Sequence, residues 1–98
     1  MDSSATSQAV TVLLPGALTE QTGGASTVRV GGETVREVIQ ALEVAWPGME
    51  YRLCFETGEL RTFVNIFVNG RNVRYLQGLE TPVPAGATLH ILPSVAGG

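Results

Sequence analysis

The spacing of hydrophobic residues changes along the chain, and each period predicts one kind of element. Val10, Val12 and Leu14 recur at every second position, which predicts a strand over residues 9–14 with one buried face. After a glycine-rich stretch, residues 26–30 are predicted to form a second strand, antiparallel to the first and joined to it by a long loop. The period then becomes helical. The apolar stripe of this predicted helix consists of Val35, Val38, Ile39, Leu42 and Trp46.

Local signals mark both ends of the helix. Thr34 followed by Glu37 fits a capping box, in which the threonine hydroxyl accepts from the Glu37 backbone N–H and the carboxylate reaches back to the cap residue. Pro47 and Gly48 are expected to end the helix. The polar side chains expected to point away from the core are Arg36, Glu37, Gln40 and Glu43.

The segment after the helix has no regular period. We expect residues 49–61 to form a loop with one short turn at residues 53–55.

Strand periodicity returns in the second half of the chain. Asn69-Gly70 follows an extended run and is typical of a two-residue hairpin turn, because both of its positions favour positive φ. The extended segments expected here are residues 63–68, a short return strand over residues 73–76, and a last strand over residues 88–92 that Pro93 ends.

The order of the predicted elements is strand, strand, helix, strand, short strand, strand. This order indicates an α+β fold, in which a right-handed crossover brings a later strand beside the first. We expect the β-grasp layout, a mixed sheet of about five strands packed on one main helix. A chain of 98 residues has room for one domain. We place it at residues 9–93, between a disordered lead at residues 1–8 and a flexible tail at residues 94–98.

Composition and charge argue against several functional classes. The six basic side chains are all arginine, the acidic ones number nine, and the net charge is −3, so the positive face needed by a nucleic-acid binder is not expected. Neither a membrane-spanning run nor a signal peptide is recognisable, which leads us to expect a cytoplasmic protein with no membrane partner. One cysteine and one histidine do not fill a four-ligand zinc site, so we expect no metal.

The two side chains most often used in catalysis are not placed for it. Cys54 lies between Leu53 and Phe55, which favours a buried structural thiol over a nucleophile. His90 lies between two apolar strand residues and should point to the opposite, solvent side. The carboxylates are scattered along the chain. The sequence therefore offers no acid–base pair for catalysis.

The carboxyl end is the distinctive part of the sequence. Beyond Glu80 no side chain carries a formal charge, His90 aside, and the chain closes on Gly97 and Gly98. A carboxylate becomes reactive only when one oxygen is converted into a leaving group, most simply by adenylation. Two residues without Cβ atoms would let an enzyme enclose the terminal carbonyl closely. Gly98 is thus the candidate reacting residue and Gly97 its spacer, with a merely frayed chain end as the alternative.

Three segments resemble a known family. The run R-T-F-V-N-I-F-V-N-G at residues 61–70, with V-R-Y at residues 73–75, and the closing L-H-I-L-P-S-V-A-G-G resemble the ubiquitin-like sulfur carriers of the ThiS/MoaD family, and most of all its CysO-type branch. The likeness covers nearly the whole chain from residue 9 onward. It implies a carrier rather than an enzyme, with no bound cofactor.

The resemblance also implies the chemistry of the chain end. An E1-like enzyme uses ATP to adenylate Gly98, and sulfur from a persulfide donor then replaces AMP to leave a thiocarboxylate. Further implied partners are a sulfur-accepting biosynthetic enzyme, for cysteine or another thio-metabolite, and a zinc-dependent peptidase. Two other functions stay open: the small subunit of molybdopterin synthase, and a ubiquitin-like protein modifier. The absence of lysine forbids lysine-linked chains of this protein but not its attachment to others.

Strand alternation places the surface that would meet these partners. Val64, Ile66 and Val68 should pack on the helix together with Leu89 and Ile91. The opposite face would then show Phe63, Asn65, Phe67, His90 and Leu92. The partner-binding residues that we predict are Phe67, His90, Leu92, Val95 and Ala96. The alternative is that the loop at residues 47–61 covers this face.

Overall fold

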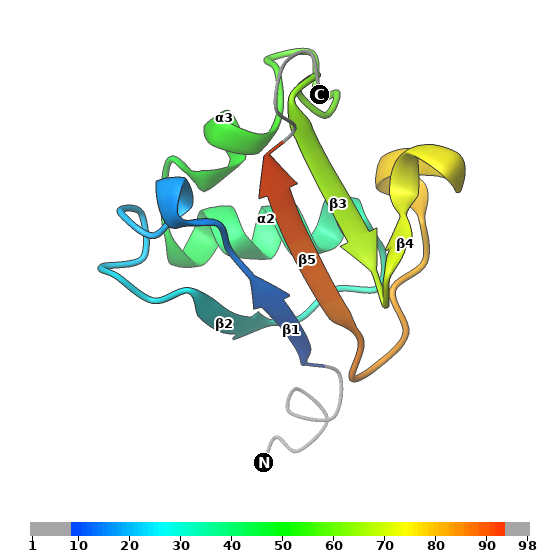
Figure 1. Ribbon diagram of the computed structural model, residues 1–98, viewed down its shortest axis with the longest axis horizontal. Coiled ribbons are helices and arrows are strands. Elements are labelled where there is room, and N and C mark those ends of the chain that lie inside the picture. Colours follow the sequence, from blue (N-terminus) through cyan, green and yellow to red (C-terminus); the bar gives the residue numbers. More distant parts are fainter. Residues whose placement is uncertain (1–8, 94–98) are drawn as a thin grey trace.

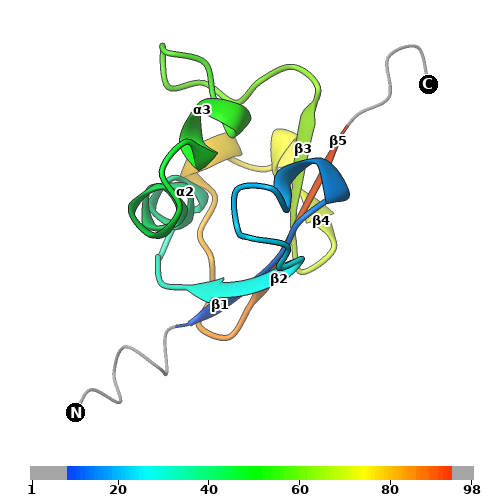
Figure 2. The same ribbon diagram turned by 90° about the vertical axis from the view of Figure 1, so that its left-hand side faces the viewer.

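The computed structural model describes residues 9–93, which form one mixed sheet with its helices on a single face (Figures 1 and 2). The strands are β1 (Val10–Leu13), β2 (Thr27–Val30), β3 (Val64–Val68), β4 (Arg71–Asn72) and β5 (Thr88–Pro93). The helices are α2 (Val35–Ala45) and α3 (Met49–Leu53), with three short 3₁₀ turns: η1 (Gly16–Leu18), η2 (Val73–Tyr75) and η3 (Gly78–Glu80). The predicted α+β class is confirmed. The lead and tail expected at residues 1–8 and 94–98 lie outside the described residues.

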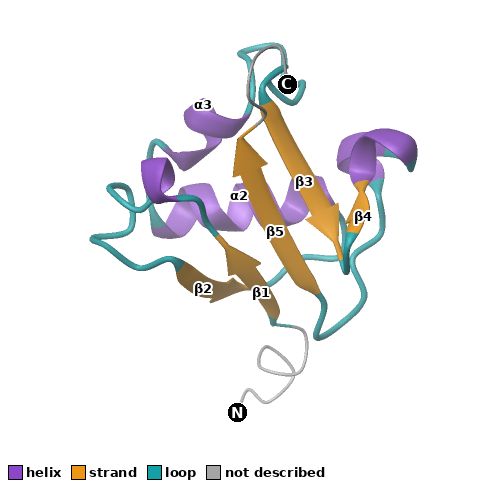
Figure 3. Cartoon of the chain, viewed as in Figure 1, coloured by secondary structure: helices purple, strands orange, loops and turns teal. Residues whose placement is uncertain are grey.

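The strand order places the last strand in the middle of the sheet. The order is β2-β1-β5-β3-β4, with β5 parallel to β1 and antiparallel to β3 (Figure 3). The crossover that carries the chain from the first hairpin to the far side of the sheet contains α2 and α3. This arrangement is the β-grasp layout predicted from the order of the elements.

The core lies between the sheet and α2. The side chain of Leu89 on β5 is fully buried, as are those of Val12 on β1 and Leu42 on α2. Each such residue contributes roughly 1.5–3 kcal/mol relative to leaving it exposed. The predicted helical stripe is confirmed, with Val35, Val38, Ile39 and Leu42 buried and Trp46, just past the end of α2, packed against the core.

One of the two hydrogen bonds of the predicted capping box at the start of α2 is present. The Thr34 hydroxyl accepts from the Glu37 backbone N–H at 3.2 Å, as expected. The Glu37 carboxylate, however, accepts from the backbone N–H of Glu33 at 2.9 Å instead of from that of the cap residue. The Glu37 carboxylate therefore stabilises the helix start by a hydrogen bond to the residue before the cap, one position further back than in a capping box.

The loop expected at residues 49–61 is wrong in its first part, where the structure has the helix α3. Met49 and Leu53 stand four positions apart and are both fully buried, so one helical face packs into the core. The Glu43 carboxylate on α2 accepts from the backbone N–H groups of Gly48 at 3.0 Å and of Glu50 at 2.9 Å. The start of α3 is thus satisfied by a side chain from the preceding helix, and Glu43 is half-buried instead of facing away.

The predicted turn at Asn69-Gly70 is confirmed, with φ of 50° and 87°. The return strand expected at residues 73–76 is wrong. Pairing with β3 stops after two residues, because the Asn72 carboxamide accepts from the Arg74 backbone N–H at 2.9 Å and caps the 3₁₀ turn η2. Val73 at the start of this turn is fully buried. A core contact and a local cap thus end the strand early.

Two adjacent glycines before α2 allow a matched test of backbone packing. A Cβ on Gly32, whose φ is +150°, would lie 2.8 Å from both the backbone nitrogen and a side-chain carbon of Val38, whereas a Cβ on Gly31 would meet nothing within 4 Å. We predict that Gly32→Ala lowers the free energy of unfolding by on the order of 1–3 kcal/mol. Gly31→Ala should stay within about 0.5 kcal/mol of the parent chain. Urea denaturation measures both, and equal effects would contradict the prediction.

Candidate functional site

The face of the sheet that carries no helix brings three of the predicted site residues together. Strand pairing sets one row across this open face, because directly paired residues point to the same side. Phe67 on β3 pairs with His90 on β5, and Leu92 follows two positions along β5, opposite Asn65. The whole row, from β2 to β4, is Thr27, Leu13, His90, Phe67 and Asn72.

This open face is accessible in the described structure. Phe63 is 57% exposed and Leu92 36%, His90 is exposed, and Phe67 is half-buried. A shallow hollow on this face is lined by Phe67, Asn69, Gly70, Thr88, His90 and Leu92. The loop that could have covered the face starts as α3, which packs beside α2 on the other side (Figure 2). The alternative in which residues 47–61 cover the open face is therefore wrong.

The end of β5 fixes where the tail begins. Pro93 is the last residue of the strand and pairs with Val64 at the start of β3. Leu92, the residue before it, lies on the open face, so the tail starts directly beside this surface. Four predicted site residues, namely Val95, Ala96, Gly97 and Gly98, lie outside the described residues.

An arginine that the sequence did not single out holds the start of β3. The guanidinium of Arg74 donates to the backbone oxygens of Arg61 at 2.7 Å and of Val64 at 2.7 Å, and more weakly to that of Thr62 at 3.2 Å. These carbonyl groups lie along the outer edge of the sheet, where β4 is too short to pair with them. These hydrogen bonds join residues ten to thirteen positions apart, so no local sequence pattern predicts them.

Cys54 is buried, as predicted. It is 3% exposed and forms an isolated β-bridge with Leu60 that closes the loop after α3. Burial raises the pKa of the Cys54 thiol, and the nearby Glu50 carboxylate raises it further, against a smaller lowering by Arg36 and Arg61. A thiol with a raised pKa is protonated near neutral pH and is a poor nucleophile.

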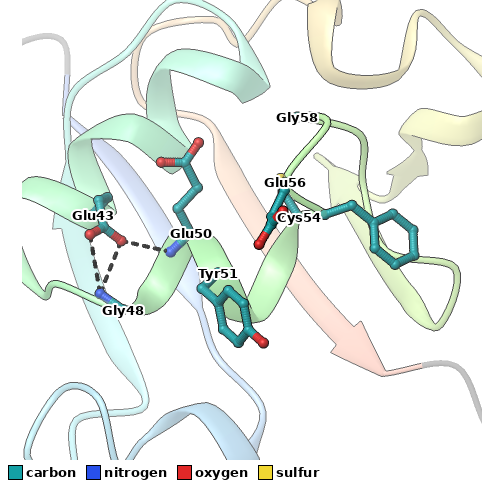
Figure 4. A pocket seen from close by; sticks show the side chains of 8 residues that line it. Glu43, Gly48, Glu50, Tyr51, Cys54, Glu56 and Gly58 are labelled. Carbon is teal, nitrogen blue, oxygen red and sulfur yellow. Dashed lines mark hydrogen bonds between the residues drawn. The ribbon is translucent and has the colours of Figure 1, made fainter.

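A hollow of about 290 Å³ beside Cys54 gathers several acidic residues (Figure 4). It is lined by Glu43, Gly48, Glu50, Tyr51, Cys54, Phe55, Glu56 and Gly58. Both oxygens of Glu43 accept from the Gly48 backbone N–H, at 3.0 and 3.2 Å, so this carboxylate serves the α2–α3 junction. Within residues 9–93, no group of three or more acidic, histidine or cysteine side chains is arranged to hold a metal ion.

The comparison with protein families matches most of the chain. The sequence profile of the ThiS family matches residues 12–98. The chain belongs to the ThiS family. It is 43% identical over 91 residues to the sulfur carrier protein CysO of Mycobacterium tuberculosis, and the alignment covers 91% of this chain and 98% of that protein.

Solved structures of similar proteins support the same assignment. The crystal structure of the Amycolatopsis orientalis BexX/CysO complex contains a chain 45% identical to this ThiS-family protein, with a TM-score of 0.84 and coverage of 91% of this chain and 99% of that one. The crystal structure of SAMP1 from Haloferax volcanii is 32% identical, with a TM-score of 0.75 and coverage of 92% and 99%.

These comparisons define the general function. The protein is a sulfur carrier of the ThiS family, similar to CysO, and the family is non-catalytic. No helix in the described part of the chain is long and apolar enough to cross a membrane.

The Arg74 contacts predict a local effect of mutation. Arg74→Ala removes the donor to three carbonyl groups beside the Val64–Pro93 pair, so amide hydrogen exchange at residues 63–65 should accelerate by roughly three- to tenfold. Exchange in α2 should not change. Arg71→Ala is the matched control, since within residues 9–93 the Arg71 side chain makes no hydrogen bond. Equal exchange rates in the two variants would contradict the role given to Arg74.

Proposed function

We propose that this protein carries sulfur as a thiocarboxylate on Gly98. An E1-like enzyme would adenylate the Gly98 carboxylate with ATP and release pyrophosphate. The outer sulfur of a persulfide donor would then bond to the same carbon as the bond to AMP breaks, giving an acyl disulfide. A second thiol would attack the donor sulfur of this acyl disulfide, forming a new disulfide and leaving the thiocarboxylate on Gly98. The thiocarboxylate would finally donate its sulfur to a biosynthetic enzyme that makes cysteine or another thio-metabolite. In the cysteine pathway, a zinc-dependent peptidase would release the product from the carrier.

The alignment with CysO carries the proposal. It spans 98% of that sulfur carrier, and the match to the ThiS family runs to residue 98, so the diglycine falls inside the family region. The described structure adds the geometry, since β5 ends at Pro93 beside the open face. From Pro93 to Gly98 the chain can reach roughly 17 Å at full extension, enough to enter a narrow enzyme site.

The open face is the proposed docking surface, centred on Phe67, His90 and Leu92 and continued by Val95 and Ala96 of the tail. Phe67 is a half-buried aromatic residue that lines the hollow on this face, and aromatic residues of this kind are common anchors of protein interfaces. The A. orientalis carrier has been solved in complex with the protein BexX. This precedent supports the proposal that the carrier forms a complex with a partner protein.

A protein modifier is the second candidate function. The small archaeal modifier protein 1 of Haloferax volcanii is 35% identical over 81 residues. A modifier would use the same activated Gly98 but would form isopeptide bonds with other proteins. The absence of lysine limits only chains built from this protein itself.

Mass spectrometry tests the proposal directly. Co-expressed with its native activating enzyme and supplied with ATP and a sulfur donor, the chain should gain the mass expected for one oxygen replaced by sulfur. The Gly98 deletion should abolish the gain, because the reacting carboxylate and its spacer are displaced. An unchanged mass for the full chain would count against the carrier chemistry. A ladder of larger protein adducts would favour the modifier, and co-purification with a large catalytic subunit would favour molybdopterin synthase.

Charged substitutions test the docking surface. Phe67→Glu and Leu92→Glu place a carboxylate in the apolar hollow, so we predict that each raises the KM of the activating enzyme for the carrier by about tenfold or more. Val44→Glu is the control, because Val44 is 85% exposed on α2, on the other side of the sheet. Circular dichroism verifies that each variant remains folded. Activation of both open-face variants at the parental KM would exclude this face as the docking surface.

A further inference from the structure

A narrow groove lies at the end of β5, where the described part of the chain stops. The last residue of β1, Leu13, pairs with His90, so residues 91–93 of β5 pair with β3 alone. Beyond β1 the chain turns at Pro15 into η1, which leaves an opening on the β1 side of residues 91–93. We call this opening the β5 groove. It has a volume of about 200 Å³ and lies between η1, α3 and the ends of β3 and β5.

The β5 groove is apolar apart from one arginine. Leu18 of η1, Leu53 of α3 and Ile91 of β5 line it, and all three side chains are buried in the core. Arg52, in the last turn of α3, is the one charged residue among those that line the groove, and it is exposed. Within residues 9–93, no carboxylate lies within ion-pair distance of the Arg52 guanidinium. The groove therefore combines an apolar wall with a cation at its rim.

The tail at residues 94–98 has the composition that this groove would accept. Val95 is the only branched aliphatic residue after Pro93, and alternation continued from β5 would direct it to the same side as Ile91. Gly98 follows three residues later, within roughly 10 Å in an extended chain. Its carboxylate has the charge opposite to that of Arg52, and no side chain of the tail carries a formal charge. The apolar and the charged group thus occur in the order that the groove requires.

We propose that the tail of the free carrier docks in the β5 groove, with the Val95 side chain against Leu18 and Leu53 and the Gly98 carboxylate beside the Arg52 guanidinium. Because the tail is covalently attached at the groove, its effective concentration there exceeds that of a separate partner. A docked tail withholds Gly98 from an activating enzyme, so the tail must leave the groove before adenylation. This consequence rests on the proposed function, whereas the docking itself does not.

The docked state is expected to be reversible. Burial of one valine side chain and formation of one exposed ion pair favour docking, whereas the conformational entropy of the tail opposes it, and these contributions are similar in size. Docked and released tails would therefore coexist. The apparent affinity of an activating enzyme for the carrier would fall in proportion to the released fraction. The groove would thus control how readily the carrier is loaded without taking part in the chemistry.

NMR spectroscopy of the isotopically labelled full chain tests the docking without any partner. Nuclear Overhauser contacts are expected between the methyl groups of Val95 and those of Leu18 and Leu53. Val95→Ser removes the apolar side chain, so the heteronuclear NOE of the Gly97 amide should fall to the value of a free chain end. Ala96→Ser is the matched control, because alternation directs residue 96 away from the groove, and it should leave the Gly97 value unchanged.

Three results would overturn the inference. The first is the absence of these methyl contacts in the parental chain. The second is an equal effect of Val95→Ser and Ala96→Ser on the Gly97 amide. The third is a set of contacts that disappears on dilution, because such contacts would place the tail in the groove of a second copy.

Arg52→Gln tests the consequence for activation. It should raise kcat/KM of ATP–pyrophosphate exchange by the native activating enzyme by roughly two- to fivefold, because a larger fraction of tails is released. Arg36→Gln is the matched control, since it removes the same charge from α2, outside the groove. The exposed ion pair of Arg36 with Glu80, at 2.7 Å, contributes little to stability, so this variant should keep the parental value.

The two measurements separate docking from the proposed function. An unchanged or lower kcat/KM for Arg52→Gln would overturn the control of activation by the groove, as would equal gains in the Arg52 and Arg36 variants. Absence of exchange with the parental chain, in a protein whose methyl contacts are present, would refute the proposed function and support the docking alone.

Discussion

The central position of β5 is the constraint on which the rest of the structure depends. A strand bonded to neighbours on both sides has every side chain assigned to one face or the other. Leu89 and Ile91 face the helices and complete the core, whereas His90 and Leu92 face outward. Because Pro93 has no N–H to donate, it suits the end of this pairing. The same strand thus stabilises the fold and builds part of the open face.

This arrangement suits a carrier whose reactive group lies at the chain end. A non-catalytic protein does not need to bury a charged residue or tune the pKa of one, and the buried thiol of Cys54 has its pKa shifted away from reactivity. The sheet can therefore have one face devoted to packing and leave the other for the proposed docking. No charged side chain is buried in the core formed by the described residues, so the fold avoids the cost of removing a charge from water.

Side chains complete the regular structure where backbone pairing ends. Glu43 on α2 satisfies the backbone N–H groups at the start of α3, and Arg74 satisfies carbonyl groups along the unpaired edge of β3. Each of these side chains hydrogen-bonds to a segment from which its own segment is separated by a turn of the chain. Polar backbone groups at helix ends and strand edges need such partners or water, and these two residues supply them within the chain.

The sequence alone determined the features that depend on neighbouring residues. Its alternation and helical spacing indicated β1, α2, β3 and β5, the turn at Asn69-Gly70 needed only its own backbone preferences, and the terminal motif indicated the family. The tertiary structure decided α3, the short β4 and the position of Arg74. The physical reason is distance along the chain. The helix α3 forms because a core receives the side chains of Met49 and Leu53. The hydrogen bonds of Arg74 join segments at least ten residues apart. Such contacts have no local period and exist only once the sheet has formed.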